Sequence, residues 1–172
     1  DPDRNDYIYD DNTVFGGLDA GDKFVILGDL NADPFDGDSF AEAANQILLS
    51  PRVNTTMTPG SAGGTEDSML EGGINNNHVG DPAFDTADFG SPGNLRVDYV
   101  LTSANLILDD SGVFWPTSDD PLKMLTLASD HRLVYADVIV PEPTTILLLL
   151  TGMIVFVSGP RAYDFTDRVS AS

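Results

Sequence analysis

Residues 23–31 read KFVILGDLN and decide the fold that we expect for this chain. Residues 23–27 are a short apolar run with β-branched members, which predicts a buried strand. Asp29 and Asn31 follow at the point where the chain leaves the sheet, and ligand sites gather at such strand ends in α/β proteins. An Asp there could deprotonate water, and an Asn could donate to an oxygen that gains charge. The same residues also suit an Asx turn, so both interpretations stay open.

Two later segments add further polar side chains beside apolar runs. Asp98 lies within RVDYVL at residues 96–101, and a carboxylate on a buried strand needs a partner. His131 is one candidate partner and Arg96 is the other. A carboxylate–histidine pair fixes the imidazole tautomer and favours its charged form. Asp130 stands next to His131, which fits an acid–base or metal site as well as a solvated turn.

The rest of the chain predicts one helix and several strands. Apolar residues at helical spacing favour a helix over 39–49, with Phe40 on its apolar face and Asp38 or Ser39 as its N-cap. Residues 51–94 resemble a long loop, in which His78 is expected to be exposed. We expect strands at 95–102, 106–108, 113–115 and 133–140, with a turn at 109–112. The pattern indicates an α/β or α+β domain that ends near residue 140.

Charge limits the partners that this chain can take. The 172 residues include 28 acidic and 8 basic side chains, for a net charge of −20. Nucleic-acid affinity comes largely from Lys and Arg that neutralise phosphates, so we do not expect tight binding of duplex DNA. The chain has no cysteine, which excludes disulfides and thiolate metal sites.

The three segments GDLN, RVDYVL and SDH, in this order, resemble the C-terminal half of the endonuclease/exonuclease/phosphatase superfamily. Residues 31–39 (NADPFDGDS), 80–88 and 93–103 resemble its bacterial secreted branch, and the resemblance covers roughly residues 5–140. It implies a four-layer α/β sandwich and metal-dependent hydrolysis of phosphate esters. The implied cofactor is Mg²⁺, or another divalent metal such as Mn²⁺ or Ca²⁺. The implied substrate is a phosphate ester, either a small molecule or a nucleic acid.

The resemblance also implies a role for each polar residue. Asp29 would orient or deprotonate the attacking water, and Asn31 would help to hold the phosphate and the metal. Asp98 would orient His131, which would contact the scissile phosphate. Asp130 would lie at the metal side of the site.

The N-terminal half of the superfamily supplies an early Asn, a metal-binding Glu and usually another His. None of these can be placed before residue 23, so we expect this chain to carry half of the site and to be weakly active or inactive alone. The alternative is a non-catalytic, surface-anchored module that retains the fold and could bind calcium. Residues 1–6 offer carboxylates for calcium, but they lack the Gly and the terminal Glu of an EF-hand, which favours a solvated acidic loop.

The last segment differs from the rest of the chain in composition, so we expect two domains, 1–140 and 141–172. Residues 143–160 carry no charge, and as a helix they would extend about 27 Å, close to the thickness of a bilayer core. This predicts a membrane helix over 144–159, with a buried core helix or strand pair as the alternative. Residues 140–145 (VPEPTT) with this run resemble the PEP-CTERM sorting signal. That signal implies export to the cell surface of a Gram-negative bacterium, transient anchoring in the inner membrane and processing by an exosortase.

Overall fold

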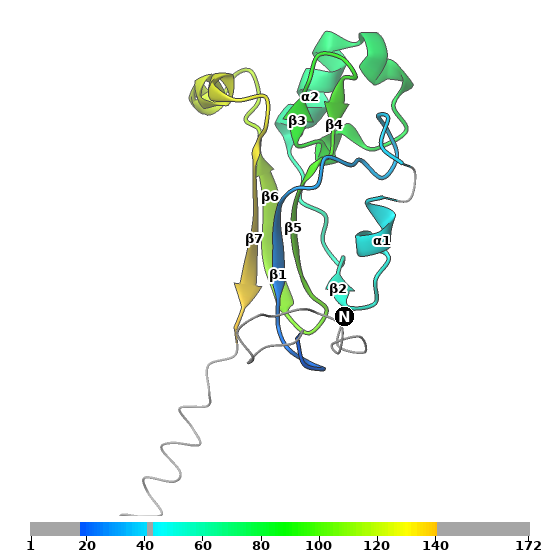
Figure 1. Ribbon diagram of the computed structural model, residues 1–172. Coiled ribbons are helices and arrows are strands. Elements are labelled where there is room, and N and C mark those ends of the chain that lie inside the picture. Colours follow the sequence, from blue (N-terminus) through cyan, green and yellow to red (C-terminus); the bar gives the residue numbers. More distant parts are fainter. Residues whose placement is uncertain (1–17, 41–42, 141–172) are drawn as a thin grey trace, which may run out of the picture. The chain divides into compact units, whose positions relative to one another are not determined.

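The computed structural model of the protein describes residues 18–40 and 43–140. The chain divides into two units, 1–139 and 140–172, and all the elements in Figure 1 that are described belong to the first. The expected acidic loop at the N-terminus and the expected membrane helix over 144–159 lie outside the described residues. Within the described ranges, no helix is long and apolar enough to cross a bilayer. The two-domain division therefore stays a prediction.

Three small antiparallel sheets make up most of the described fold (Figure 1). The first has the order β1-β5-β2, the second pairs β3 with β4, and the third pairs β6 with β7. The strands are β1 (Val25–Asp29), β2 (Val53–Asn54), β3 (Ala87–Asp88), β4 (Asn94–Leu95), β5 (Asp98–Ser103), β6 (Ile107–Phe114) and β7 (Leu133–Ile139). The structure is thus mixed α/β, as expected, with small sheets and few helices. The four-layer sandwich stays a prediction.

The helices are short, and α2 lies beside β3 and β4 (Figure 1). They are α1 (Asn45–Leu48), α2 (Ala62–Glu71) and the 3-10 segments η2 (Gly73–Asn77), η3 (Pro82–Phe84) and η4 (Pro121–Ala128).

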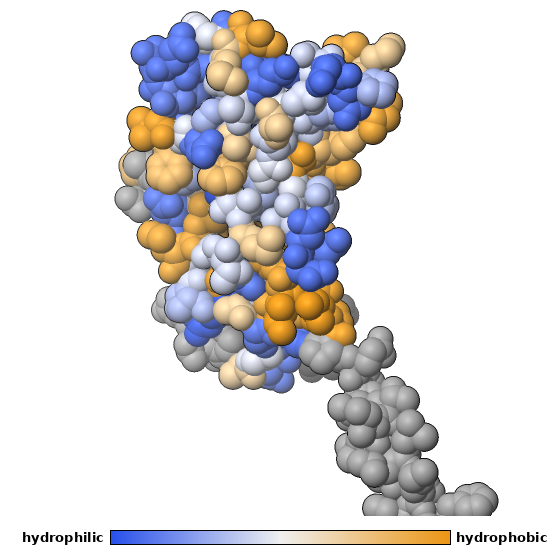
Figure 2. All heavy atoms as spheres, turned by 180° about the vertical axis from the view of Figure 1, so that it is seen from behind, coloured by the Kyte–Doolittle hydropathy of each residue, from blue (hydrophilic) through white to orange (hydrophobic). Residues whose placement is uncertain are grey.

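The main core lies on one face of the first sheet. Tyr99 and Leu101 of β5 point to this face and pack with Ala44 beside α1. The opposite face of β1 is more open, because Leu27 is 69% exposed although we expected a buried strand. Among the described residues β1 pairs only with β5, so it forms an edge of the sheet. Figure 2 shows exposed apolar side chains on several parts of the surface.

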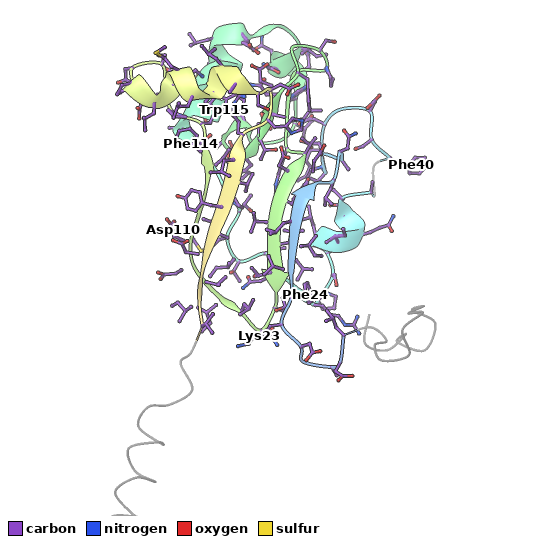
Figure 3. The ribbon with its side chains drawn as sticks, turned by 60° about the vertical axis from the view of Figure 1, so that its left-hand side comes forward. Lys23, Phe24, Phe40, Asp110, Phe114 and Trp115 are labelled. Atoms are coloured by element: carbon purple, nitrogen blue, oxygen red, sulfur yellow. The ribbon has the colours of Figure 1, made fainter. Side chains whose placement is uncertain are left out.

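The predicted helix over 39–49 is wrong in its first half. Helix α1 covers only Asn45–Leu48, and its N-cap is Ala44 instead of Asp38 or Ser39. The Ser39 hydroxyl donates to the carbonyl of Asp33 at 3.2 Å, so it stabilises the preceding loop. Phe40 is 88% exposed and points away from the protein (Figure 3).

The prediction of a long loop over 51–94 is also wrong, because helix α2 lies within it. The Ser61 side chain caps this helix by accepting from the backbone N–H of Gly64 at 3.0 Å. Gly63 has weak helix propensity, but it allows the backbone of α2 to approach the carbonyl of Trp115, where a Cβ would overlap. Tertiary packing of this kind has no periodic signal in the sequence.

The expected turn at residues 109–112 is instead the middle of β6. This strand runs through Asp110 and Gly112 and pairs with β7 over its whole length, with an irregularity between Leu108 and Asp110. Strand β7 offers a continuous partner, and pairing along it outweighs the local turn preference. Strand β7 itself matches its predicted span to within one residue.

Candidate functional site

The centre of the site is a contact between Asp98 and His131. Asp98 begins β5 and His131 lies just before β7, and their Oδ2 and Nδ1 atoms are 2.8 Å apart. The two side chains are 17% and 34% exposed, so water and a substrate can reach the imidazole. Arg96, the other candidate, lies over the Tyr99 ring at 4.8 Å. The predicted partnership of Asp98 with His131 is therefore present in the structure.

The short strand β3 and its neighbours hold both members of this pair. The Thr86 hydroxyl accepts from the backbone N–H groups of Val97 and Asp98 at 3.0 and 2.8 Å. Ala87 forms an antiparallel bridge with His131. Thr86 and Ala87 are consecutive, so one short segment contacts both Asp98 and His131. Sequence reasoning missed Thr86 because it falls in the stretch that we expected to be a loop.

Acidic neighbours favour the charged form of the imidazole. The hydrogen bond that His131 Nδ1 donates to Asp98 raises the pKa of His131 above its ordinary value, and partial burial opposes this rise. The charges of Asp98, Asp29 and Asp130 raise it further. Because Nδ1 contacts Asp98, the other ring nitrogen Nε2 is the atom that can donate to a bound anion.

Asp29 lies opposite Asp98 in the antiparallel pairing of β1 with β5. Residues directly opposite share one face, with Cβ atoms about 5 Å apart, and two like charges in this arrangement destabilise a sheet. A protonated His131 would offset that repulsion, because it contacts Asp98 and the charge of Asp29 contributes to its raised pKa. The Asx turn is present as well, since Asp29 Oδ1 accepts from the N–H of Asn31 at 2.6 Å and Asn31 has φ of 49°. The Asx-turn interpretation of GDLN is therefore confirmed, and the catalytic interpretation of Asp29 and Asn31 stays a prediction.

Asp130 is exposed, and its carbonyl accepts from the N–H of Asp88 at 2.8 Å. This bond fixes the loop before His131 to β3, and the charge of Asp130 contributes to the raised pKa of His131. His78, which we expected to be exposed, is instead half-buried and contacts the carbonyl of Pro92 through Nε2 at 3.1 Å.

Asp29, Asn31 and Asp130 offer carboxylate and amide oxygens, the ligand chemistry that Mg²⁺ prefers. This ion commonly binds one or two carboxylates and completes its shell with water and substrate phosphate. The described residues around His131 fit that mode, although they form no group of three converging carboxylate or imidazole ligands.

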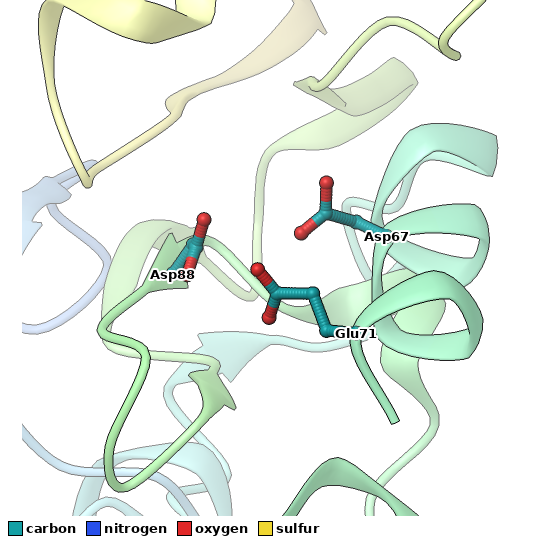
Figure 4. Close-up of side chains that lie close together, drawn as sticks. All are labelled: Asp67, Glu71 and Asp88. Atoms are coloured by element: carbon teal, nitrogen blue, oxygen red, sulfur yellow. The ribbon is translucent and has the colours of Figure 1, made fainter. Parts of the chain in front are cut away.

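Such a three-carboxylate group occurs elsewhere, at Asp67, Glu71 and Asp88, whose ligand atoms lie within 4.8 Å of one another (Figure 4). Burial raises the pKa of Glu71, and the charges of Asp88 and Asp67 add to this. Lys123 contacts Asp67 at 3.0 Å and Arg132 lies 3.5 Å from Asp88. Cations of the chain therefore already offset two of the three carboxylates, and these ion pairs link α2 to η4 and β3 to the residue after His131.

The same two cations lie over the ring of Trp115, which is 2% exposed. The Arg132 guanidinium is 4.3 Å from the ring centroid and the Lys123 ammonium is 5.8 Å from it. Figure 3 shows Trp115 beside the helical segment η4. Arg132 directly follows His131. Its packing against Trp115 therefore holds the C-terminal end of the loop that carries His131.

One family description matches the chain, over residues 1–131: the Endonuclease/Exonuclease/phosphatase family. No curated protein and no solved structure matches the chain.

Proposed function

The chain belongs to the endonuclease/exonuclease/phosphatase family, and from this we propose that it hydrolyses phosphate esters at the site around His131. The contact between His131 and Asp98 carries the proposal, because it orients the imidazole and raises its pKa beside two exposed acidic residues. The proposed cofactor is Mg²⁺ or another divalent metal held by Asn31 and Asp130, with Asp29 next to them.

In the proposed mechanism, His131 donates from Nε2 to a phosphoryl oxygen and stabilises the charge that develops there. Asp98 is a positioning residue, because it holds Nδ1 and favours the imidazolium. Asp29 accepts the proton of the attacking water, and Asn31 donates its amide N–H to the phosphoryl group. When bound, a divalent cation offsets negative charge on the phosphoryl group.

We propose a small phosphate ester as the substrate in preference to duplex DNA, because a net charge of −20 opposes binding of a polyanion. Export, a membrane anchor over 144–159 and processing by an exosortase remain proposals that rest on the sequence of the C-terminal segment.

The test combines hydrolysis of bis(p-nitrophenyl) phosphate by the full chain, with and without Mg²⁺, with NMR of the two imidazoles. We expect slow hydrolysis that requires Mg²⁺, and a phosphate-dependent shift of the His131 signal. His78 is the internal reference, because it is the second of two histidines and lies apart from the site.

Two variants distinguish the site from unspecific effects. His131→Ala abolishes hydrolysis, whereas the matched control His78→Ala retains it. Hydrolysis that survives His131→Ala, or a chain that shows neither turnover nor a shift of the His131 signal, contradicts the proposal.

A further inference from the structure

The carboxylates of Asp67, Glu71 and Asp88 converge between α2 and β3 (Figure 4). Lys123 contacts Oδ1 of Asp67 at 3.0 Å, and Arg132 lies 3.5 Å from Oδ2 of Asp88. Three negative charges thus face two positive ones, which leaves an excess of negative charge in the cluster. Burial raises the pKa of Glu71, and repulsion from Asp88 and Asp67 raises it further.

One oxygen of this cluster is buried without a hydrogen bond. Oδ2 of Asp67 has no partner among the described residues, whereas Oδ1 accepts from Lys123 at 3.0 Å. A buried carboxylate oxygen without a donor loses its hydration and gains no bond in return. A cation bound at Oδ2 would offset that loss.

A second unpartnered group comes from Asn94 of β4, which is 0% exposed. Neither Oδ1 nor Nδ2 of its side chain has a hydrogen-bond partner in the part of the chain that the structure describes. Most buried side-chain amides are hydrogen-bonded, so this amide points to a partner that the described residues do not supply. Its Oδ1 atom is an acceptor, and amide oxygens bind Ca²⁺.

The pairing of β3 with β4 directs this amide toward the carboxylates. Asn94 lies directly opposite Asp88 in the antiparallel register. Residues in opposite positions share one face of the sheet, with Cβ atoms about 5 Å apart. Asn75 connects the same groups, because its Oδ1 accepts from the Asn94 N–H at 2.9 Å and its Nδ2 donates to Glu71 at 3.3 Å. The Asn94 amide therefore lies beside two members of the cluster.

The ligand atoms and their spacing favour Ca²⁺ over Mg²⁺. The three carboxylates offer oxygens within 4.8 Å of one another. Ca²⁺ binds oxygens at about 2.3–2.6 Å, so oxygens on opposite sides of one ion lie about 5 Å apart. Ca²⁺ also accepts irregular geometry and amide oxygens, whereas Mg²⁺ requires a near-ideal octahedron at about 2.0–2.1 Å.

We propose that this cluster is a structural Ca²⁺ site that joins α2 to the β3–β4 pair. Its ligands are the side chains of Asp67, Glu71, Asp88 and Asn94. The site goes beyond the proposed function, because its ligands are separate from the residues proposed to hold the catalytic metal. The N–H of Asp88 donates to the carbonyl of Asp130 at 2.8 Å, so Ca²⁺ also holds the strand that supports the loop before His131.

The experiment is an NMR titration of the full chain with Ca²⁺ in excess Mg²⁺, together with thermal unfolding followed by circular dichroism. Excess Mg²⁺ occupies the proposed catalytic site, so the Ca²⁺ response reports a different one. The signals to follow are the side-chain amide of Asn94 and the backbone amides of residues 67, 71 and 88. We expect a Kd of about 0.1–1 mM, as in weak extracellular Ca²⁺ sites. Saturating Ca²⁺ should raise the unfolding midpoint by about 5 °C.

Four variants make the assignment specific. Asp67→Asn should weaken Ca²⁺ binding at least about 10-fold. Asn94→Leu removes a ligand oxygen and both unpartnered polar atoms, so it should fold and still bind Ca²⁺ about 3- to 10-fold more weakly. Lys123→Met removes a competing cation and should strengthen binding about 5-fold. Asp109→Asn, an exposed carboxylate on β6, is the matched control for the loss of one charge and should leave the affinity unchanged.

A cluster that forms ion pairs only would give different results. Ca²⁺ that leaves the Asn94 signal and the unfolding midpoint unchanged overturns the inference. Binding that is as tight in Asp67→Asn and Asn94→Leu as in the wild type overturns it as well, as does weakening by Asp109→Asn. His131→Ala should leave the Ca²⁺ affinity unchanged, so failure of the proposed hydrolysis does not affect this site.

Discussion

Replacing Asp85 by Asn should stabilise the protein at neutral pH. Asp85 is 7% exposed and lies just before β3, among other acidic side chains. Burial raises the pKa of Asp85 from 3.8 to about 8, and the charges of Asp33, Asp36 and Asp81 add to the rise. At pH 7 the folded protein therefore holds a proton on this carboxyl that the unfolded chain has lost.

The sign and the size of the effect follow from this difference. Between pH 4 and 8 the folded state binds more protons than the unfolded state, so the free energy of unfolding falls as the pH rises through this window. At pH 7 the solution pH lies above the unfolded pKa of 3.8. Keeping the proton on Asp85 in the folded state then costs at most about 4 kcal/mol of the free energy of unfolding. Relaxation of the neighbours reduces this value, and we expect Asp85→Asn to add about 2 kcal/mol at pH 7 and little near pH 4.

Urea unfolding followed by circular dichroism at pH 4.5, 6, 7 and 8.5 measures the effect in both proteins. Asp137→Asn, on the exposed part of β7, controls for the loss of one negative charge. The stability gain of Asp85→Asn should grow with pH up to about pH 8. A gain that is the same at pH 4.5 and 8.5, or a loss at pH 7, would refute the reasoning.

Three further predictions concern the site and helix α2. Asp98→Asn removes the main cause of the raised pKa of His131, so an NMR titration should show this pKa falling; an unmoved His131 would contradict the pairing. Ser61→Ala removes the N-cap of α2 and should reduce the free energy of unfolding by about 1 kcal/mol in urea titrations. Gly63→Ala places a Cβ where the backbone after β6 already lies, and should cost about 1–3 kcal/mol in the same assay. Equal midpoints for wild type and either variant would show that the cap or the close approach at that residue does not stabilise the protein.

The parts of the site that the sequence could predict are those carried by strands. Asp98 lies in an alternating run, which fixes its face, and a buried carboxylate has few possible partners in a chain with two histidines. The same reasoning places β7 after His131. The alternation of apolar and polar residues identifies these strands, so the contact between Asp98 and His131 could be predicted.

The parts that the sequence could not predict depend on contacts between distant segments. Thr86 supports Asp98 through two backbone bonds, but nothing in its neighbours indicates a strand. Helix α2 has two glycines directly after its first residue and no apolar stripe, and its position depends on the close approach of Gly63 to Trp115. Phe40 fits the apolar face of a helix that does not extend to it.

The packing of Trp115 gives the protein an internal optical probe. This residue is the only tryptophan, so all indole fluorescence comes from one position. Its ring is buried under Arg132, the residue directly after His131. Any shift of the loop that carries the imidazole changes the distance between a guanidinium and the emitting ring. The emission spectrum of the unlabelled protein thus records movement at the site without any added dye.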